Sequence, residues 1–410
     1  MTEFETLLDH YADITVKIGL NVQKGQDVMI FAPIESPEFV RKVVKKAYEV
    51  GAKQVFVEWN DEELTRIRLD LANEASLKEY PAWRSGSYQT LSDQDAAFLY
   101  IYSPNPELLN GVDPLRVASA QKAAAAANKQ FSMDKSSAKV SWTIVSVPTV
   151  SWSKKIYPKM DEAERMRALW KQIFAITRAD NEDPEQAWKN HIQSLNDKLD
   201  YFNEKRFKFL HYKAPGTELT IELIPEHLWI GGGMTNAHGV PFQPNMPTEE
   251  IFTMPLKTGV NGTVSSTKPL NYGGNLIDHF SITFENGRII DCQAEKGLDT
   301  LKQIIDTDEG AHFLGEVSLV PHHSPISDTN LIFYNTLFDE NASCHLAIGH
   351  SYPFNYRGGR EMSEEALAAK GANMSLAHVD FMVGSDALDI DGETHDGQSV
   401  PIFRNGNWAI

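Results

Sequence analysis

Cysteine is scarce in this chain of 410 residues, which contains only Cys292 and Cys344. Two cysteines cannot form a disulfide framework, and such scarcity favours a reducing compartment. The first residues lack the basic start and the apolar stretch of a signal peptide. The longest run of bulky apolar residues, from Ala96 to Tyr102, is far too short to span a bilayer. We therefore expect a cytoplasmic protein that has no membrane as a partner.

Basic residues are also few, because 38 lysines and arginines stand against 56 acidic residues, for a net charge of −18. Nucleic acids and anionic membranes attract concentrated lysine and arginine, and the chain has no basic stripe. The composition therefore argues against nucleic acid as a partner. An acidic surface keeps a protein in solution, and it would also attract cationic substrates such as molecules with a free amine.

The first half lacks the glycine-rich loops that bind phosphate, since neither a Gly-x-Gly-x-x-Gly nor a Walker-type loop follows any apolar segment. Its apolar segments nevertheless alternate with amphipathic ones, which predicts a mostly parallel sheet covered by helices. The predicted strands are 28–32, 54–59, 96–102 and 140–147, and the predicted helices are 4–22, 36–50, 61–74, 113–129, 161–177 and 184–203. We interpret residues 1–205 as an α/β scaffold or dimerisation domain that ends in a helical bridge.

The second half loses the helical periodicity, and from Arg206 onward short alternating runs predict strands. We expect residues 206–410 to form a β-rich α+β domain, because a chain of this length exceeds one hydrophobic core. Asn286-Gly287 lies between two apolar runs and predicts a tight hairpin, since both turn positions need positive φ. Helices are predicted near 298–306 and 363–370, and turns are predicted from Asp389 to Gly397.

Residues 340–380 carry the side-chain types of a metal site. Carboxylates and imidazoles occur there together, a mixture that zinc, cobalt and manganese accept as ligands. His378 and Asp380 are two residues apart, so on an extended strand both point to one face. A single His-x-Asp pair is often only a pair of hydrogen-bonding surface residues. However, twelve of the thirteen histidines follow residue 190, and this skew indicates that the chemistry lies in the second half.

Two further acidic stretches extend the candidate site. Glu249 and Glu250 stand just before a predicted strand, where they could equally face water. Glu316 is a solitary acid in the otherwise apolar run from Phe313 to Leu319. A buried carboxylate needs a partner, and a metal ion is one that removes the cost of burial.

Four of these motifs follow one another in an order that resembles a known family. They are Asn245-Met-Pro-Thr-Glu-Glu-Ile-Phe-Thr, Gly315-Glu-Val, Glu340-Asn-Ala-Ser-Cys-His with Gly349-His-Ser-Tyr, and His378-Val-Asp. In this order they are similar to the M29 family of metallo-aminopeptidases, the group of aminopeptidase T, AmpS and PepS. The resemblance extends over essentially the whole chain, including the opening α/β half.

The resemblance implies an α/β N-terminal domain and a β-rich catalytic domain, assembled as a homodimer around an internal cavity. It implies removal of N-terminal residues from peptides with two divalent cations per chain, for which zinc, cobalt, magnesium and manganese are candidates. By motif position the metal ligands would be Glu250, Glu316, Glu340, His345, His378 and Asp380. Tyr352 would be the catalytic phenol, and Glu249 beside Glu250 leaves an ambiguity of one residue.

Such chemistry explains why these residue types are needed. Two cations about 3.5 to 4 Å apart lower the pKa of a bridging water and polarise the scissile carbonyl. Glu316 has two oxygens and is the candidate to bridge them, and Tyr352 could donate a proton toward the oxyanion unless it is an ordinary buried tyrosine. An exopeptidase must also bind a free amine, and the acids available for this are Glu249, Asp386, Asp389 and Asp391.

Other functions share these residues. A binuclear hydrolase that cleaves a phosphoester or a non-peptide amide would use the same metals, and a non-catalytic metal-binding dimer would hold them without turnover. Tyr352 beside the candidate ligands argues against the second of these. A serine or cysteine hydrolase is disfavoured, because no Gly-x-Ser-x-Gly elbow is present and because Cys344 is next to His345 in sequence, which does not create the required geometry.

Overall fold

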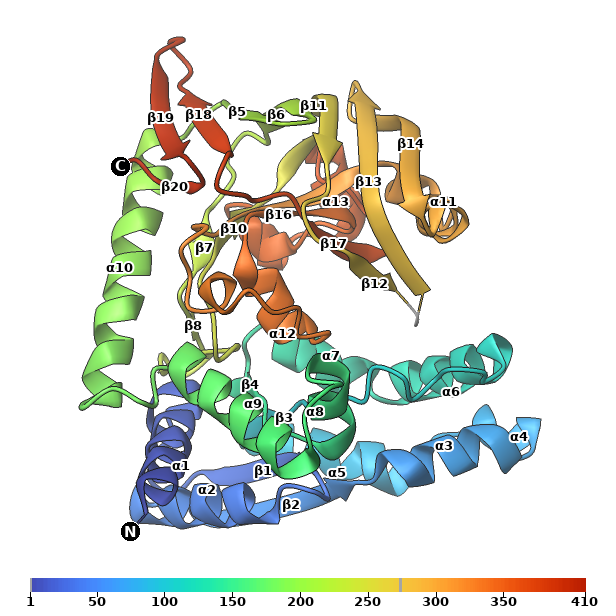
Figure 1. Cartoon of the computed structure of the whole chain (residues 1–410), viewed down its shortest axis with the longest axis vertical. Helices are drawn as coiled ribbons and strands as arrows, with labels where there is room; N and C mark the ends of the chain where they lie inside the picture. Colours follow the sequence, from blue (N-terminus) through green and yellow to red (C-terminus); the bar gives the residue numbers. More distant parts are fainter. Residues whose placement is uncertain (1, 273–274) are drawn as a thin grey trace. The chain divides into compact units, whose positions relative to one another are not determined.

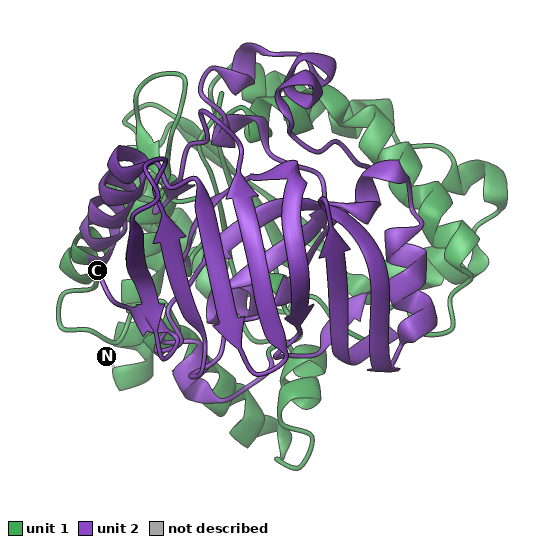
Figure 2. Ribbon diagram, turned by 90° about the horizontal axis from the view of Figure 1, so that it is seen from above, with its two compact units in different colours: residues 1–190, 233–247, 333–337 green, residues 191–232, 248–332, 338–410 purple. Residues whose placement is uncertain are grey.

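The computed structural model describes residues 2–272 and 275–410 of the chain. These residues form two compact units, shown in two colours in Figure 2. Unit 1 comprises residues 1–190, 233–247 and 333–337, and unit 2 comprises 191–232, 248–332 and 338–410. The sequence predicts continuous domains, 1–205 and 206–410, whereas two short segments from the second half pack with unit 1. No helix in the described ranges combines the length and the apolar character needed to cross a bilayer.

Unit 1 is built on a four-stranded sheet in the order β2-β1-β3-β4, and all of its pairs are parallel. The strands are β1 (Asp27–Pro33), β2 (Gln54–Asn60), β3 (Ala97–Ile101) and β4 (Trp142–Val145). Strands β1 and β3 are almost continuously buried, as expected of parallel strands that helices cover. The predicted mixed α/β fold class, with a parallel sheet in its first half, is therefore confirmed (Figure 1).

The helices of unit 1 follow the predicted alternation but include four that the sequence pattern misses, one of which is the single turn α4 (Glu74–Leu77). The first predicted helix is α1 (Glu3–Ile14), which continues as a π-helical turn over Thr15–Leu20. The missed helices α5, α7 and α8 bury few apolar side chains, so their sequences carry little periodic signal. The helices are α2 (Pro37–Glu49), α3 (Glu62–Leu71), α4 (Glu74–Leu77), α5 (Ala82–Asp93), α6 (Pro114–Ala127), α7 (Lys129–Ser136), α8 (Val150–Ile156), α9 (Glu162–Ile176) and α10 (Pro184–Lys205). A short hairpin of β8 (Met234–Thr235) and β9 (Pro241–Phe242) also belongs to unit 1.

Unit 2 contains a large antiparallel sheet in the order β12-β13-β11-β6-β5-β18-β19-β20, with β14 paired to β13. Its strands are β5 (Phe209–Ala214), β6 (Thr217–Leu223), β11 (Pro255–Ser265), β12 (Leu270–Tyr272), β13 (Asn275–Glu285), β14 (Arg288–Lys296), β18 (Asp389–Glu393), β19 (Ser399–Arg404) and β20 (Asn407–Trp408). The predicted hairpin is confirmed, since Asn286 and Gly287 both have positive φ between β13 and β14. The turns predicted from Asp389 are wrong in their first half, because β18 pairs with β5 and β19 there.

A second sheet of unit 2 has five strands in the order β17-β16-β15-β10-β7, all antiparallel. They are β7 (Ile230–Gly231), β10 (Ile251–Thr253), β15 (Leu314–Leu319), β16 (His345–Gly349) and β17 (His378–Met382), and the accompanying helices are α11 (Leu298–Ile305), α12 (Thr336–Asp339) and α13 (Glu364–Lys370). Short 3-10 turns lie at Glu309–His312, Ser327–Thr329, Glu340–Ala342, Pro353–Asn355 and Gly359–Glu361.

One hydrophobic core joins the two sheets of unit 2. Alternate residues of the five-stranded sheet enter it, namely Leu314, Val317, Leu319, Leu346, Ile348, Val379 and Phe381, and the ring of Phe381 lies 5.7 Å from that of Phe280 on the larger sheet. Because neighbouring residues of a strand point to opposite faces, the residues between them face away from this core. That second face carries the polar side chains of the sequence motifs.

Strand β15 has a bulge at Gly315. Leu314 and Val317 both enter the core although they are three residues apart, and the register with β16 shifts between Leu314 and Glu316. One extra residue restores the alternation, so that Glu316 points away from the core. A side chain at Gly315 would overlap the carbonyl oxygens of Gly349 and His350. The bulge therefore requires glycine.

We expect Gly315→Ala to lower the free energy of unfolding by about 1 to 3 kcal/mol, as overpacked sites typically do. The added methyl would also displace the carbonyl of His350, which orients His378, so metal binding should weaken. Denaturant unfolding and metal titration would measure the two effects. Gly86→Ala is the control, because a methyl there meets no atom within 4 Å. Equal behaviour of the two variants would contradict the role of the bulge.

Candidate metal centre

Carboxylates and imidazoles gather on the face of the five-stranded sheet that points away from the core. Glu316 lies on β15, His345 on β16, and His378 and Asp380 on β17, while Glu250 directly precedes β10. Ala347 pairs in register with Glu316 on one side and with Asp380 on the other. Its small side chain leaves the middle of this face open, so three strands and the residue before a fourth direct their polar groups toward one place.

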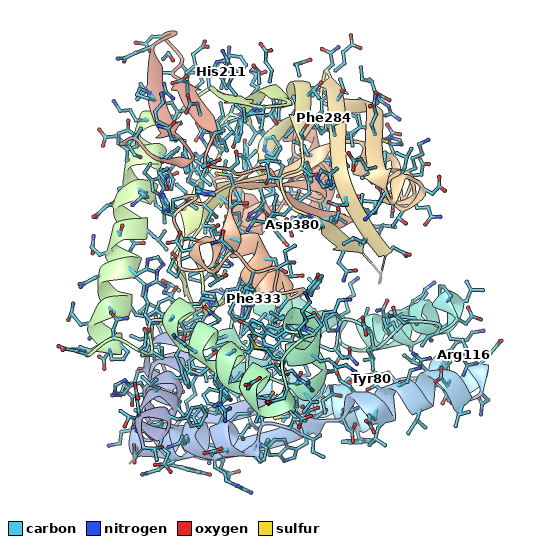
Figure 3. All side chains as sticks on the ribbon, viewed as in Figure 1. Tyr80, Arg116, His211, Phe284, Phe333 and Asp380 are labelled. Atoms are coloured by element: carbon cyan, nitrogen blue, oxygen red, sulfur yellow. The ribbon has the colours of Figure 1, made fainter. Side chains whose placement is uncertain are left out.

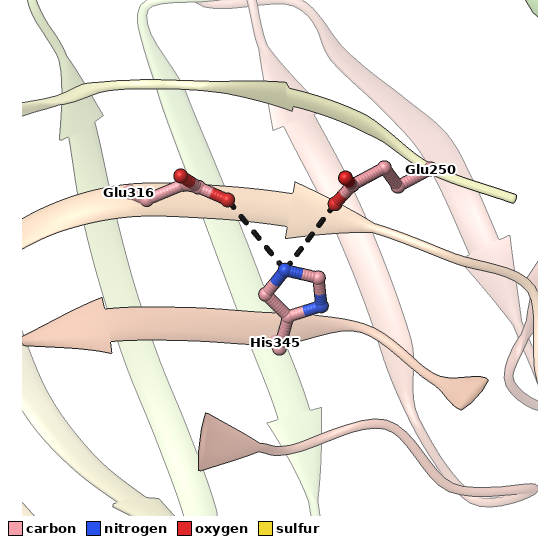
Figure 4. Close-up of side chains that lie close together, drawn as sticks. All are labelled: Glu250, Glu316 and His345. Atoms are coloured by element: carbon pink, nitrogen blue, oxygen red, sulfur yellow. Dashed lines mark ion pairs between the residues drawn. The ribbon is translucent and has the colours of Figure 1, made fainter. Parts of the chain in front are cut away.

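These residues form two groups in which all candidate ligand atoms lie within 4.8 Å of one another. The first group is Glu250, Glu316 and His345, and the second is Glu316, His378 and Asp380. In the first group, Nε2 of His345 lies 3.3 Å from Oε2 of Glu250 and 3.5 Å from Oε1 of Glu316. Figure 4 shows both carboxylates directed at the same ring nitrogen.

Glu316 belongs to both groups because its two oxygens point in different directions. Oε1 faces His345, and Oε2 lies 3.5 Å from Nε2 of His378. Asp380 completes the second group, with Oδ1 3.4 Å from the same nitrogen of His378. A carboxylate that offers one oxygen to each of two adjacent groups has the geometry of a bridging ligand.

Both histidines are held from behind by backbone carbonyls. Nδ1 of His345 lies 3.2 Å from the carbonyl of Ser343, and Nδ1 of His378 lies 2.8 Å from that of His350. A carbonyl can only accept, so each Nδ1 is the protonated nitrogen. In the neutral rings Nε2 is then left with its lone pair directed at the carboxylates, as metal-binding histidines require.

Burial makes the charges of this cluster mutually dependent. Glu250, Glu316 and His345 are 9%, 5% and 2% exposed. Burial raises the pKa of Glu316, and repulsion from Asp380 and Glu250 adds to this, although His345 and His378 oppose it. Burial would lower the pKa of His345, but Glu250 and Glu316 raise it well above its usual value. In the same way Asp380 and Glu316 overcome burial and raise the pKa of His378 to about 9.

The two acids that the sequence leaves ambiguous lie in different places. Glu250 faces the cluster, whereas Oε2 of Glu249 lies 3.5 Å from Nε2 of His191. Glu340 lies in the turn before β16 and belongs to neither group of ligand atoms within 4.8 Å. It is nevertheless close enough for the other acids to shift its pKa. Burial raises its pKa well above the usual value, and Glu250 and Asp380 add to that rise.

Tyr352 lies at the edge of the cluster. Its ring is stacked on Phe354 at 5.1 Å and lies 4.7 Å from the ring of His378. Burial raises the pKa of the Tyr352 phenol, and repulsion from Glu316 and Asp380 raises it further. The phenol therefore keeps its proton at neutral pH, which is the state that a proton donor needs.

Three residues that the sequence leaves open have structural roles. Asp389 and Asp391 lie on β18 of the larger sheet, where Asp389 accepts a hydrogen bond from the backbone of Asn405 and Asp391 pairs with Arg404. Cys344 is buried, its thiol lies 3.3 Å from the carbonyl of Val320, and burial raises its pKa to about 12. A thiol that stays protonated is a poor nucleophile, which agrees with the exclusion of a cysteine hydrolase.

The donor set fits divalent cations. Four acids, Glu250, Glu316, Glu340 and Asp380, lie together with only two imidazoles, and their ion pairs among the described residues are with those imidazoles. Oδ1 of Asp380 is buried and accepts no hydrogen bond within the described part of the chain. Like charges that are buried together are stabilised by a cation, and mixed oxygen and nitrogen donors suit zinc, cobalt or manganese.

Two adjoining groups of carboxylates and imidazoles on one sheet face are typical of metal-dependent hydrolases. Residues 4–408 match the model of a single family, the thermophilic metalloproteases (M29), and the chain belongs to this family. It is 51% identical to aminopeptidase AmpS of Bacillus subtilis over 410 residues, which is all of both chains. It is 52% identical to aminopeptidase 2 of Geobacillus stearothermophilus, covering 100% of this chain and 99% of that one.

A solved structure, that of wild-type AmpT from Thermus thermophilus, resembles this chain throughout. The TM-score is 0.94 at 41% identity, and the match covers 99% of this chain and 100% of the other. The family and the enzyme class predicted from the motifs are thereby confirmed. What the sequence motifs do not reveal is the layer behind the candidate ligands. The carbonyl of His350 is a backbone group and carries no sequence signal, and the hydroxyl of Ser318 meets Glu250 only through the pairing of distant strands.

Metal binding to the metal-free protein should release protons. The pKa of His378 is about 9, so its ring is protonated at pH 7, and the raised pKa of His345 has the same effect. A metal ion binds the neutral ring. The apparent affinity should therefore rise with pH between 6 and 8, by about tenfold per pH unit for each proton released. Calorimetric titration in buffers with different ionisation heats would count these protons, and an affinity that does not change with pH would contradict the protonated state.

Proposed function

We propose that this chain removes single N-terminal residues from peptides with two divalent cations held by the cluster around Glu316. The observation that carries this proposal is that Glu316 offers one oxygen to the group of His345 and the other to the group of His378. Full-length similarity to proteins named aminopeptidases supports the choice of bond over a phosphoester or another amide.

Each residue of the proposed site has a distinct part. Glu250 and His345 would hold one ion, His378 and Asp380 the other, and Glu316 would bridge the two. Glu340 would either stand behind the ligands or become a further ligand of the ion held by Glu250 and His345. Burial and its acidic neighbours raise its pKa, but it belongs to neither group of ligand atoms. When bound, the two ions would supply Lewis acidity for the carbonyl and a water of lowered pKa.

Tyr352 is the proposed proton donor. Stacking on Phe354 and the contact with His378 restrict its ring, and burial keeps its phenol protonated. A fixed phenol beside the bridging carboxylate can donate a hydrogen bond to the oxygen on which charge develops during hydrolysis. Removal of such a donor typically lowers kcat by about 10² to 10³. A protein that only binds metal would not need a protonated phenol oriented beside the candidate ligands.

Variants should separate metal binding from turnover. We expect Glu316→Gln and His378→Ala to lose both metal and activity while they remain folded, whereas Tyr352→Phe should keep both ions and lose about 10² or more in kcat. His211→Ala and Tyr356→Phe are controls, since His211 pairs with Glu393 on the larger sheet and Tyr356 packs in a separate apolar cluster (Figure 3 labels His211 and Asp380). A Tyr352→Phe variant with the wild-type rate would refute the donor role.

The direct test of the proposed reaction is hydrolysis of amino-acid p-nitroanilides and short peptides. The purified protein would be treated with chelator and then supplied with zinc, cobalt, magnesium or manganese. We expect single N-terminal residues to be released only when metal is present and only from substrates with a free amine. Release from N-acetylated peptides, or no release with two ions bound, would instead favour the other hydrolase or the metal-binding protein.

We also propose a homodimer in a reducing, cytoplasmic setting. Leu64, Ile67 and Leu71 lie three and four residues apart on α3 and are 64%, 52% and 80% exposed. This spacing forms an apolar stripe on one helix face, and exposed apolar stripes are typical of interfaces. The two cysteines are unpaired, which supports the choice of compartment.

The double variant Leu64→Lys/Leu71→Lys should convert the proposed dimer to a monomer, because burying two ammonium groups in an interface is costly. Sedimentation velocity of wild-type and variant chains would measure this. Ile290→Lys is the matched control, since Ile290 is 56% exposed on β14. A wild-type monomer, or a variant that still dimerises, would argue against the α3 stripe as the interface.

A further inference from the structure

The hydroxyl of Ser318 lies directly behind one of the candidate metal ligands. Ser318 is fully buried on β15, and its Oγ donates a hydrogen bond of 2.7 Å to Oε2 of Glu250. The same oxygen is 3.3 Å from Nε2 of His345. Ser318 also pairs in register with Phe252 on β10 and with His345 on β16. It therefore stands between the strands that bring Glu250 and His345 together.

The position of Ser318 follows from the alternation of β15. Glu316 and Ser318 are two residues apart, so both point to the face of the sheet that carries the cluster, whereas Val317 and Leu319 enter the core. Its hydroxyl makes its hydrogen bond to the carboxylate of Glu250, which arrives from the neighbouring strand end.

Glu250 depends on such a contact more than the histidines do. The rings of His345 and His378 are held by backbone carbonyls, and each has only two side-chain torsions. Glu250 has three torsions and lies outside a regular strand, so the hydrogen bond from Ser318 and the ion pair with His345 are the contacts that fix its carboxylate. A short hydrogen bond to an ionised carboxylate is stronger than one between neutral groups and fixes its direction.

We propose that Ser318 is a positioning residue: by orienting the carboxylate of Glu250 it strengthens ion binding by the group of Glu250, Glu316 and His345. This inference rests on the proposed binuclear site. The contact concerns the group of Glu250, Glu316 and His345 and leaves the group of His378 and Asp380 untouched. Loss of the hydroxyl therefore weakens one ion position and spares the other. A defect in folding or in the whole sheet has no such asymmetry.

Metal titration of the chelator-treated chain tests this asymmetry. The wild type should bind two zinc or cobalt ions per chain. Competition with a chromophoric chelator would give the affinities, and elemental analysis would count the ions. In Ser318→Ala we expect one ion to bind about 10- to 100-fold more weakly, the usual cost of losing a partner behind a ligand, while the other keeps its affinity. Ser318→Thr retains the hydroxyl and should restore both positions.

Thr253→Val is the matched control. Thr253 is a fully buried residue of β10, and its hydroxyl donates a hydrogen bond of 3.0 Å to the carbonyl of Leu228 rather than to a carboxylate of the cluster. Its loss should leave both ion affinities unchanged. If Ser318→Ala does not fold, Ser318→Val is the second variant, because it has the shape of Ser318→Thr, lacks the hydroxyl and offers no atom that binds a metal.

The kinetics should show that the loss of activity in Ser318→Ala comes from weaker binding of one ion. Activity of Ser318→Ala should be low at limiting metal and recover toward the wild-type kcat at saturating metal, with KM unchanged. Equal affinities for both ions in Ser318→Ala, or an equal loss in Ser318→Ala and Thr253→Val, would overturn the positioning role. A wild type that binds two ions without aminopeptidase activity would refute the proposed reaction and leave the titration as a test of Ser318. A wild type that binds no ion would overturn both.

Discussion

Repulsion between buried carboxylates is the constraint that the rest of this structure accommodates. Glu250, Glu316 and Asp380 lie around two imidazoles in a largely buried place, where the imidazoles of His345 and His378 offset part of the repulsion between the carboxylates. The large hydrophobic core on the opposite face of the same sheet maintains this arrangement. Apolar burial on one face thus stabilises a sheet whose other face gathers carboxylates that repel one another.

A strand that is apolar on one face and ligating on the other depends on its register, since a slip of one residue would turn the ligands into the core. The bulge at Gly315 shows how closely this register is controlled. It inserts one residue so that Leu314 and Val317 both remain in the core while Glu316 points to the site. Glycine is required because the backbone at Gly349 and His350 approaches closely. The same approach brings the His350 carbonyl to the ring of His378.

The two layers of the site differ in what can be changed by mutation. The histidines are oriented by carbonyl groups, which substitution leaves in place, whereas Glu250 is oriented by the hydroxyl of Ser318. Of the two proposed ion positions, the one that contains Glu250 is therefore the more open to change by substitution. The ring of Tyr352 is oriented in a third way, by stacking on Phe354.

Sequence patterns alone predict the fold class, the parallel sheet of the first half, the Asn286-Gly287 hairpin and the placement of His378 and Asp380 on one strand face. These features depend on local periodicity and turn chemistry, which neighbouring residues carry. Helices such as α5, with few buried apolar residues, left no such pattern, and β18 was hidden by acids and glycine. The folded chain is needed to show that Glu250 rather than Glu249 faces the cluster and that Glu316 has one oxygen in each group. Those facts arise from contacts between strands that lie far apart in the chain, where pairing register and side-chain direction are set by the packed core.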